Sequence, residues 1–255
     1  MIICKDLNES DIINSLKDWE TKCPPAKDEH WKDGRNAKEL GRAWITDFTK
    51  QGELINNLIN QYFESKIDFI MVSPEFETRF DKYGSGRKHD LLIIGQLNKD
   101  KIVIGIEAKV DEPFSNKLIK EYLLQKQLDI WNGENSNVPA RIEELLKAIF
   151  QKKFTIKHLE LRYQLVYSIA SILAEAKIRK AKYAFFIIEK FVTEKINQRQ
   201  DSVNQKDLDN LISALSENTI SRFQENHLMG PYKVPGNDMI PNDIELFLGM
   251  AINIV

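Results

Sequence analysis

Two apolar runs in the middle of the chain predict a β-hairpin. Residues 89–94 and 102–109 are rich in Leu, Ile and Val, and the polar residues 96–101 between them are typical of a turn. With the turn centred in that polar stretch, Leu91 faces Ile106 across the hairpin. Side chains alternate between the two faces of a strand, so this register also fixes which polar residues come together at the strand ends.

Charged residues gather where these two strands end. The register places Asp90 opposite Glu107, and Lys109 points to the same side as Glu107 because side chains two apart share a strand face. Directly opposed residues have Cβ atoms roughly 4.5–5.5 Å apart, and like charges there are destabilising. A cation between the acids would remove that cost, so the pattern predicts a divalent-metal site with an adjacent ammonium group. The alternative is that these charges only mark where buried strands emerge into water.

The order Asp, a hairpin, then Glu-x-Lys resembles the core motif of the PD-(D/E)XK nuclease superfamily. The resemblance implies that Asp90 and Glu107 hold Mg²⁺ (or Mn²⁺), that the Ala108 carbonyl adds an oxygen ligand, and that Lys109 positions or activates the attacking water. The Pro that usually precedes the first acid is His89 here. The implied activity is Mg²⁺-dependent hydrolysis of phosphodiester bonds in DNA or RNA, with restriction or phage defence as the expected setting.

The superfamily has a restriction-endonuclease-like αβββαβ core, an α/β fold with a mixed sheet. The resemblance implies a helix, three antiparallel strands, a helix and a strand, and hydrophobic periodicity predicts helices and strands in this order. The expected elements are residues 37–50, 66–72, 89–94, 102–109, 159–180 and 183–189. Residues 30–40 and 162–165 also resemble an uncharacterised bacterial branch of the superfamily, so the resemblance covers about residues 30–190.

Two polar residues on the predicted helices are further candidates. Members of the superfamily often supply another acid from the first helix, and Glu39 is expected to aid metal binding in this way. Asn36 precedes Glu39 by the spacing of a capping box, and the two interpretations are not exclusive. The second core helix often offers Gln or Lys towards the site, so Gln164 is expected to orient the metal or a phosphate. The alternative for Gln164 is an ordinary amide on the flank of a helix.

Basic residues near the motif are candidates for phosphate contacts. A turn with two glycines precedes Arg87, Lys88 and His89, and Arg162 lies near the N-terminal end of the second core helix, where a phosphate could bind. Lys and Arg contacts to phosphate dominate nucleic-acid affinity. The alternative is that residues 84–89 are a solvated connecting loop.

The chain is predicted to form a single domain of residues 1–255, in which the remaining segments are additions to the core. A helical insertion occupies residues 112–158, and a C-terminal extension occupies residues 200–255. Within the additions, helices are expected at 11–20, 117–130, 139–150 and 206–215, and strands at 232–234 and 244–252. The insertion directly follows Lys109, so we expect it to lie over the metal site.

Composition narrows the function classes. The chain has 255 residues, 42% hydrophobic and 29% charged, with a net charge of −2, which argues against indiscriminate coating of nucleic acid. No apolar run approaches the ~20 residues that cross a bilayer, and no zinc spacing, P-loop, nucleophile elbow or Rossmann fingerprint occurs, so we expect a cytoplasmic protein without membrane contact. We expect a nuclease that acts on nucleic acid, with DNA favoured, and a homodimer or a defence-system partner remains open. The alternative is an inactive nuclease-fold module that binds nucleic acid or a protein partner.

Overall fold

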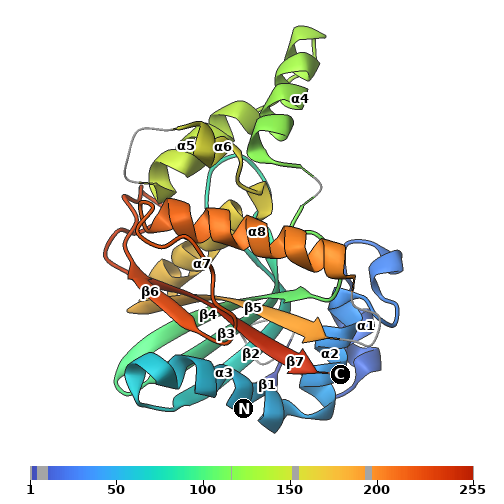
Figure 1. Cartoon of the computed structure of the whole chain (residues 1–255). Helices are drawn as coiled ribbons and strands as arrows, with labels where there is room; N and C mark the ends of the chain where they lie inside the picture. Colours follow the sequence, from blue (N-terminus) through green and yellow to red (C-terminus); the bar gives the residue numbers. More distant parts are fainter. Residues whose placement is uncertain (1, 5–10, 116, 151–154, 193–196, 255) are drawn as a thin grey trace.

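The chain folds around one mixed β-sheet. The computed structural model describes residues 2–4, 11–115, 117–150, 155–192 and 197–254. These residues form a seven-stranded sheet in the order β1-β2-β3-β4-β5-β7-β6, with helices on both faces (Figure 1). The expected fold class, α/β with a mixed sheet, is confirmed. The strands are β1 (Ile2–Ile3), β2 (Ile67–Thr78), β3 (Arg87–Leu97), β4 (Asp100–Lys109), β5 (Tyr183–Val192), β6 (Leu228–Tyr232) and β7 (Glu245–Ile254).

The centre of the sheet is the predicted hairpin. β2, β3 and β4 are antiparallel neighbours, and β5 runs parallel to β4. Leu91 pairs with Ile106 and the ladder ends at the turn, so the predicted register is confirmed. Asn98 in the turn has a φ of 56°, a left-handed conformation that Asn adopts more readily than most residues.

Helices form a layer on each face of the sheet. They are α1 (Leu16–Lys22), α2 (Asn36–Thr46), α3 (Phe48–Phe63), α4 (Ile119–Trp131), α5 (Val138–Ile149), α6 (Ile156–Leu159), α7 (Tyr163–Arg179) and α8 (Gln198–Leu215), with a 3₁₀ turn at Asp28–His30. In Figure 1, α2 and α3 lie below the sheet and α7 and α8 above it. α7 approaches β4 closely at Gly105, where a Cβ atom would lie 2.5 Å from the side chain of Ile172. Gly105 therefore lets α7 pack directly over the strand that carries Glu107.

Both core helices differ from the prediction. The expected helix 37–50 is two helices, because Asp47 leaves helical geometry and its side chain accepts a hydrogen bond from Lys50 N (3.0 Å) to begin α3. The expected helix 159–180 begins only at Tyr163. Arg162 before it is extended and forms an isolated β-bridge with Leu118, which separates α6 from α7.

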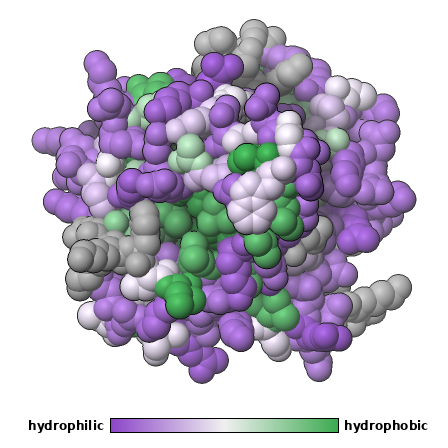
Figure 2. Space-filling model, turned by 90° about the horizontal axis from the view of Figure 1, so that it is seen from above, coloured by the Kyte–Doolittle hydropathy of each residue, from purple (hydrophilic) through white to green (hydrophobic). Residues whose placement is uncertain are grey.

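The additions also differ at their boundaries. α1 begins at Leu16 rather than at 11, α8 begins at Gln198 rather than at 206, and β6 ends at Tyr232 where a strand was expected to start. Within the insertion, α4 projects from the rest of the chain (Figure 1), whereas Phe114 lies against Lys109. Leu124, Leu128 and Trp131 on α4 are exposed. Figure 2, seen from above, shows hydrophobic side chains gathered within a mainly hydrophilic face.

None of the helices in the described part of the chain is long and apolar enough to cross a membrane.

The layer of α2 and α3 is fixed to the sheet by a buried polar network. Glu189 on β5 is fully buried and accepts hydrogen bonds from Trp44 Nε1 of α2 (3.0 Å) and from Asn253 Nδ2 of β7 (3.2 Å). Asn253 also donates to Gln51 Oε1 of α3 (2.9 Å). Burial raises the pKa of Glu189 to about 7, although both donors act to lower it. Among the hydrogen bonds and ion pairs of the described residues, no cation contacts Glu189 and offsets the effect of burial on its pKa.

This network predicts a pH-dependent stability. Between pH 4.5, the ordinary carboxyl value, and about 7, the folded state keeps a proton on Glu189 that the unfolded chain has released, so stability falls as the pH rises through this window. Glu189→Gln removes the charge and should flatten this slope, with a gain of about 3 kcal/mol in the free energy of unfolding at pH 8. Urea unfolding at pH 5 and pH 8 measures it, with the exposed Glu53→Gln on α3 as control. Equal slopes for wild type and Glu189→Gln would contradict the assignment.

Candidate functional site

The candidate site is built around the carboxylate of Glu107. Glu107 lies near the end of β4, faces α7 and is 1% exposed. Its Oε1 accepts hydrogen bonds from Lys109 Nζ (2.8 Å) and from Gln164 Nε2, and its Oε2 accepts one from Arg87. The donors come from β4, α7 and β3 respectively, so three elements meet at one buried carboxylate.

Asp90 reaches the same place from the neighbouring strand. The ladder between β3 and β4 ends at Leu91 and Ile106, and Asp90 Oδ2 then accepts a hydrogen bond from Ala108 N (2.8 Å). The N–H and C=O groups of one strand residue point to the same neighbour, so the Ala108 carbonyl is also directed towards the β3 side. The structure thus brings Asp90, Glu107 and Lys109 together as the motif predicts, whereas their catalytic roles stay predictions.

Lys109 retains capacity for further contacts. Its Nζ lies 5.1 Å from the centre of the Phe114 ring, in the segment that follows β4. This segment is held in place by Asn36, whose side chain accepts from Val110 N (2.8 Å) and donates to Glu112. An ammonium group has three donors, and one of them is used by Glu107 in the described contacts.

Of the residues expected to contact phosphate before the motif, Arg87 and His89 are buried in β3. Arg87 begins β3, is 6% exposed and is paired with Glu107, and its guanidinium lies 5.4 Å from the centre of the Tyr167 ring. His89 is 1% exposed, and burial, reinforced by Arg87, lowers the pKa of His89 well below 6.5, so it is neutral rather than cationic. Of the three, only Lys88 is exposed, so only it is placed for the predicted phosphate contact.

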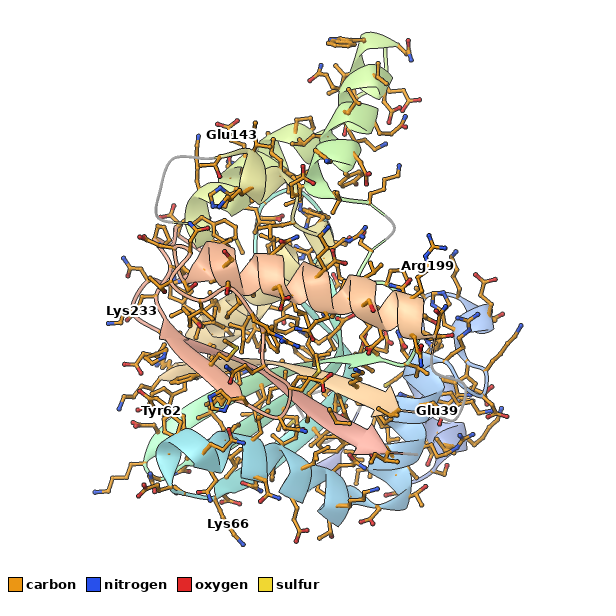
Figure 3. All side chains as sticks on the ribbon, viewed as in Figure 1. Glu39, Tyr62, Lys66, Glu143, Arg199 and Lys233 are labelled. Atoms are coloured by element: carbon orange, nitrogen blue, oxygen red, sulfur yellow. The ribbon has the colours of Figure 1, made fainter. Side chains whose placement is uncertain are left out.

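Two other predicted contacts are replaced by internal ion pairs. Arg162 donates to Asp207 Oδ2 on α8 (2.8 Å) and to the Ser115 carbonyl (3.1 Å), so it fastens α8 to the segment after β4. Glu39 is buried on α2 and accepts from Arg42 (2.7 Å) and Gly34 N (2.7 Å), so the expected capping box with Asn36 is absent. In Figure 3, Glu39 lies on α2 at the side of the molecule where β5 and β7 end.

Gln164 occupies the position that the sequence suggests. It lies on the first turn of α7, and its amide donates to Glu107 Oε1. The Gln164 amide is therefore directed towards the acids of the site. Its expected contact with a metal ion or a phosphate stays a prediction.

Glu75 is an acid of the site that the sequence analysis missed. The pairs Pro74–Leu91 and Phe76–His89 flank it, so Glu75 lies opposite Asp90 across β2 and β3. Its φ of 50° is a strained left-handed conformation for a residue with a side chain. The expected strand ended at residue 72, whereas β2 continues through Pro74 to Thr78 and so carries Glu75 to a position beside the site.

The acids of the site have opposite pKa shifts. Burial acts to raise the pKa of Glu107, but Lys109 and Arg87 outweigh it and the pKa lies below the ordinary value. Burial and the charge of Glu107 raise the pKa of Asp90. Burial and Asp90 raise the pKa of Glu75 to about 8. Glu107 is therefore ionised at neutral pH, whereas Glu75 is mostly protonated and Asp90, whose pKa is raised to about 7, is partly protonated in the absence of a cation.

The acids of the site supply some, but not all, of the ligands that a metal ion needs. Within the described residues, no group of three or more His, Cys, Asp or Glu is arranged to hold a metal, so Glu39 is not gathered with Asp90 and Glu107. Mg²⁺ needs only one or two carboxylates and fills its remaining positions with water and phosphate oxygens. Asp90 and Glu107 satisfy that requirement, and Asp90 has one carboxylate oxygen outside its bond to Ala108.

Comparison with known proteins gives a family but no activity. Residues 12–253 match the family described as "Domain of unknown function (DUF6946)". The chain belongs to this family. No curated protein and no solved structure matches it.

The buried pair of Arg87 and Glu107 should stabilise the fold. Arg87→Met leaves a buried carboxylate with one cation fewer, and removing one partner of a buried pair typically costs about 3–5 kcal/mol. Arg35→Met is the matched control, because Arg35 is 48% exposed in its ion pair with Glu112 and such pairs contribute about 0–1 kcal/mol. Urea unfolding of both variants measures the difference. Similar losses for the two variants would show that the Glu107 carboxylate does not depend on Arg87.

Proposed function

We propose that this chain is a metal-dependent phosphodiesterase that cleaves nucleic acid, with DNA favoured over RNA, in the cytoplasm. The observation that carries the proposal is the convergence of Asp90, Glu107 and Lys109 at the ends of β3 and β4. The order of α2, β2–β4, α7 and β5 supports the resemblance to the PD-(D/E)XK nuclease superfamily, as does Gln164 on α7. We also propose that the chain acts in restriction or phage defence, either with a partner protein from such a system or as a homodimer.

Asp90 and Glu107 would hold Mg²⁺ (or Mn²⁺), with the Ala108 carbonyl as a further ligand and Glu75 as the nearest additional acid. The ion would polarise the phosphate and lower the pKa of a bound water. Lys109, with donors left over after its bond to Glu107, would orient the attacking water or stabilise the negative charge that develops on phosphorus oxygens. Gln164 would hold Glu107 in the orientation that ligation requires.

One observation favours a second candidate, an inactive nuclease-fold module that binds nucleic acid or a protein. Both oxygens of Glu107 are already satisfied by Lys109, Gln164 and Arg87. Metal ligation would have to replace at least one of these donors. A module that never binds metal would keep the arrangement as it is, so the two candidates differ in metal affinity.

Cleavage is the direct test of the proposed function. Asp90→Asn keeps an acceptor for Ala108 N but loses the charge, and Lys109→Met keeps the packing on Phe114 but loses the ammonium. Each should reduce Mg²⁺-dependent cleavage of labelled single-stranded or duplex DNA and RNA by about 10²-fold or more. Chelation with EDTA should abolish the wild-type activity.

Exposed residues of the same hairpin provide the controls. Asp100→Asn and Lys101→Met lie on β4 away from the site and should cleave as wild type. Undiminished cleavage by both Asp90→Asn and Lys109→Met, or cleavage in EDTA, would refute the site.

Metal binding separates the two candidates. Calorimetric titration of the wild type with Mn²⁺ should show one site that Asp90→Ala and Glu107→Gln each weaken, because the loss of a carboxylate removes a ligand and a charge. The same titration of Asp100→Asn should match the wild type. A wild-type chain that takes up no Mn²⁺ through Asp90 and Glu107 would leave the binding module as the function.

A further inference from the structure

Three tyrosines form a continuous row beside the candidate site. Tyr163 and Tyr167 are one turn apart on α7, and their ring centres are 4.8 Å apart at 69°. Tyr122 from α4 extends the row, with its ring centre 5.4 Å from that of Tyr163. The row therefore joins the base of the projecting helix α4 to the beginning of α7.

One end of the row reaches the acids. The Tyr167 ring lies under the guanidinium of Arg87, which is bonded to Glu107. Gln164 lies between Tyr163 and Tyr167 in the sequence and donates to the same carboxylate. Anything that lay along the tyrosines would have one end next to Asp90 and Glu107.

The row is also accessible to solvent. All three tyrosines are half-buried, whereas residues 168–176 of α7 are all buried. None of their hydroxyl groups has a hydrogen bond among the described contacts, yet none is among the buried polar atoms without a partner, so each hydroxyl keeps contact with solvent. By contrast, the hydroxyl of Tyr83 in the neighbouring loop is bonded to Glu144 (2.5 Å). Packing alone would be served by Phe at the three positions.

Three cations near the site are paired with carboxylates, whereas Lys88 is exposed. Arg87 and Lys109 are paired with Glu107, and Arg162 is paired with Asp207. The whole chain has a net charge of −2. Duplex binding depends mainly on Lys and Arg contacts to phosphate, whereas single strands also offer base faces that stack on aromatic rings. An aromatic row next to paired cations therefore suits unpaired bases better than a duplex.

We propose that Tyr122 and Tyr163 form a stacking platform for the bases of single-stranded nucleic acid. Tyr167, whose ring is stacked on Phe80 and lies against Arg87, connects this platform to Asp90, Glu107 and Lys109. The position of the nucleic-acid backbone rests on the proposed function, but stacking on the tyrosines is measurable without cleavage. The chain would thus prefer single-stranded DNA or RNA to a duplex, with little dependence on base sequence, because every base has a π face.

The test is binding by the full chain in EDTA, where no metal-dependent cleavage occurs. The probes are a fluorescently labelled thymidine oligonucleotide of about 12 nucleotides, an abasic deoxyribose-phosphate strand of the same length, and a duplex of that length. The thymidine strand should bind about tenfold more tightly than the abasic strand, which carries the same charge. It should also bind more tightly than the duplex. Equal affinity for thymidine and abasic strands, or no binding of the thymidine strand, would overturn the inference.

Paired variants assign the effect to the rings. Tyr163→Leu should weaken thymidine-strand binding about tenfold and leave abasic-strand binding unchanged, whereas Tyr163→Phe keeps the ring and should stay within about twofold of wild type. Tyr122→Leu and Tyr122→Phe repeat the comparison on α4, and urea unfolding identifies any variant that is not folded. If the Leu variants bind the thymidine strand like the Phe variants, the platform is refuted, even where the cleavage tests succeed. Ring-dependent binding without cleavage would support the platform and refute the phosphodiesterase alone.

Discussion

Glu107 carries a carboxylate that is almost completely withdrawn from water, and its surroundings keep that carboxylate ionised. Burying an isolated ion costs several kcal/mol even after the protein relaxes, and the cost is offset only when charges and hydrogen bonds replace the lost water. Arg87, Lys109 and Gln164 supply those bonds from β3, β4 and α7. A shift of any one of these elements would leave an uncompensated charge. The carboxylate therefore fixes how α7 sits on the sheet and, with it, where Tyr163 and Tyr167 lie.

A second buried carboxylate, on the opposite face of the sheet, shows how burial changes the pKa of an acid that has no cation beside it. Glu189 on β5 pairs in register with Ala108, the residue next to Glu107. Its partners Trp44 and Asn253 are neutral, and its pKa is raised to about 7, whereas two cations hold the pKa of Glu107 below its ordinary value. Burial alone thus favours a neutral acid, as at Glu189, and the charge at Glu107 requires dedicated partners.

The sequence was informative where local rules decide the structure. Two apolar runs and one polar turn suffice to set the register of β3 and β4, and that register brings Asp90 to Glu107. The prediction was wrong where a distant contact decides. Asp47 breaks a helical pattern in favour of capping α3, and Arg87 resembles a loop cation until Glu107 is placed beside it. Glu75 was missed because β2 continues through Pro74 to Thr78, whereas the apolar run in the sequence ends at residue 72.

The acids and cations of the site together set its net charge, and that charge would decide what the site can bind. Glu75, Asp90 and Glu107 influence one another and face Arg87 and Lys109, so full ionisation would leave one negative charge in excess. The raised pKa values of Glu75 and Asp90 are the response to that excess and to burial, since protonation removes it. A divalent cation would remove it without protons and leave one positive charge in excess. That excess positive charge matches the single negative charge of a phosphodiester, whereas a metal-free site with all three acids ionised would repel it. Metal affinity and substrate affinity are in this view coupled through the same carboxylates.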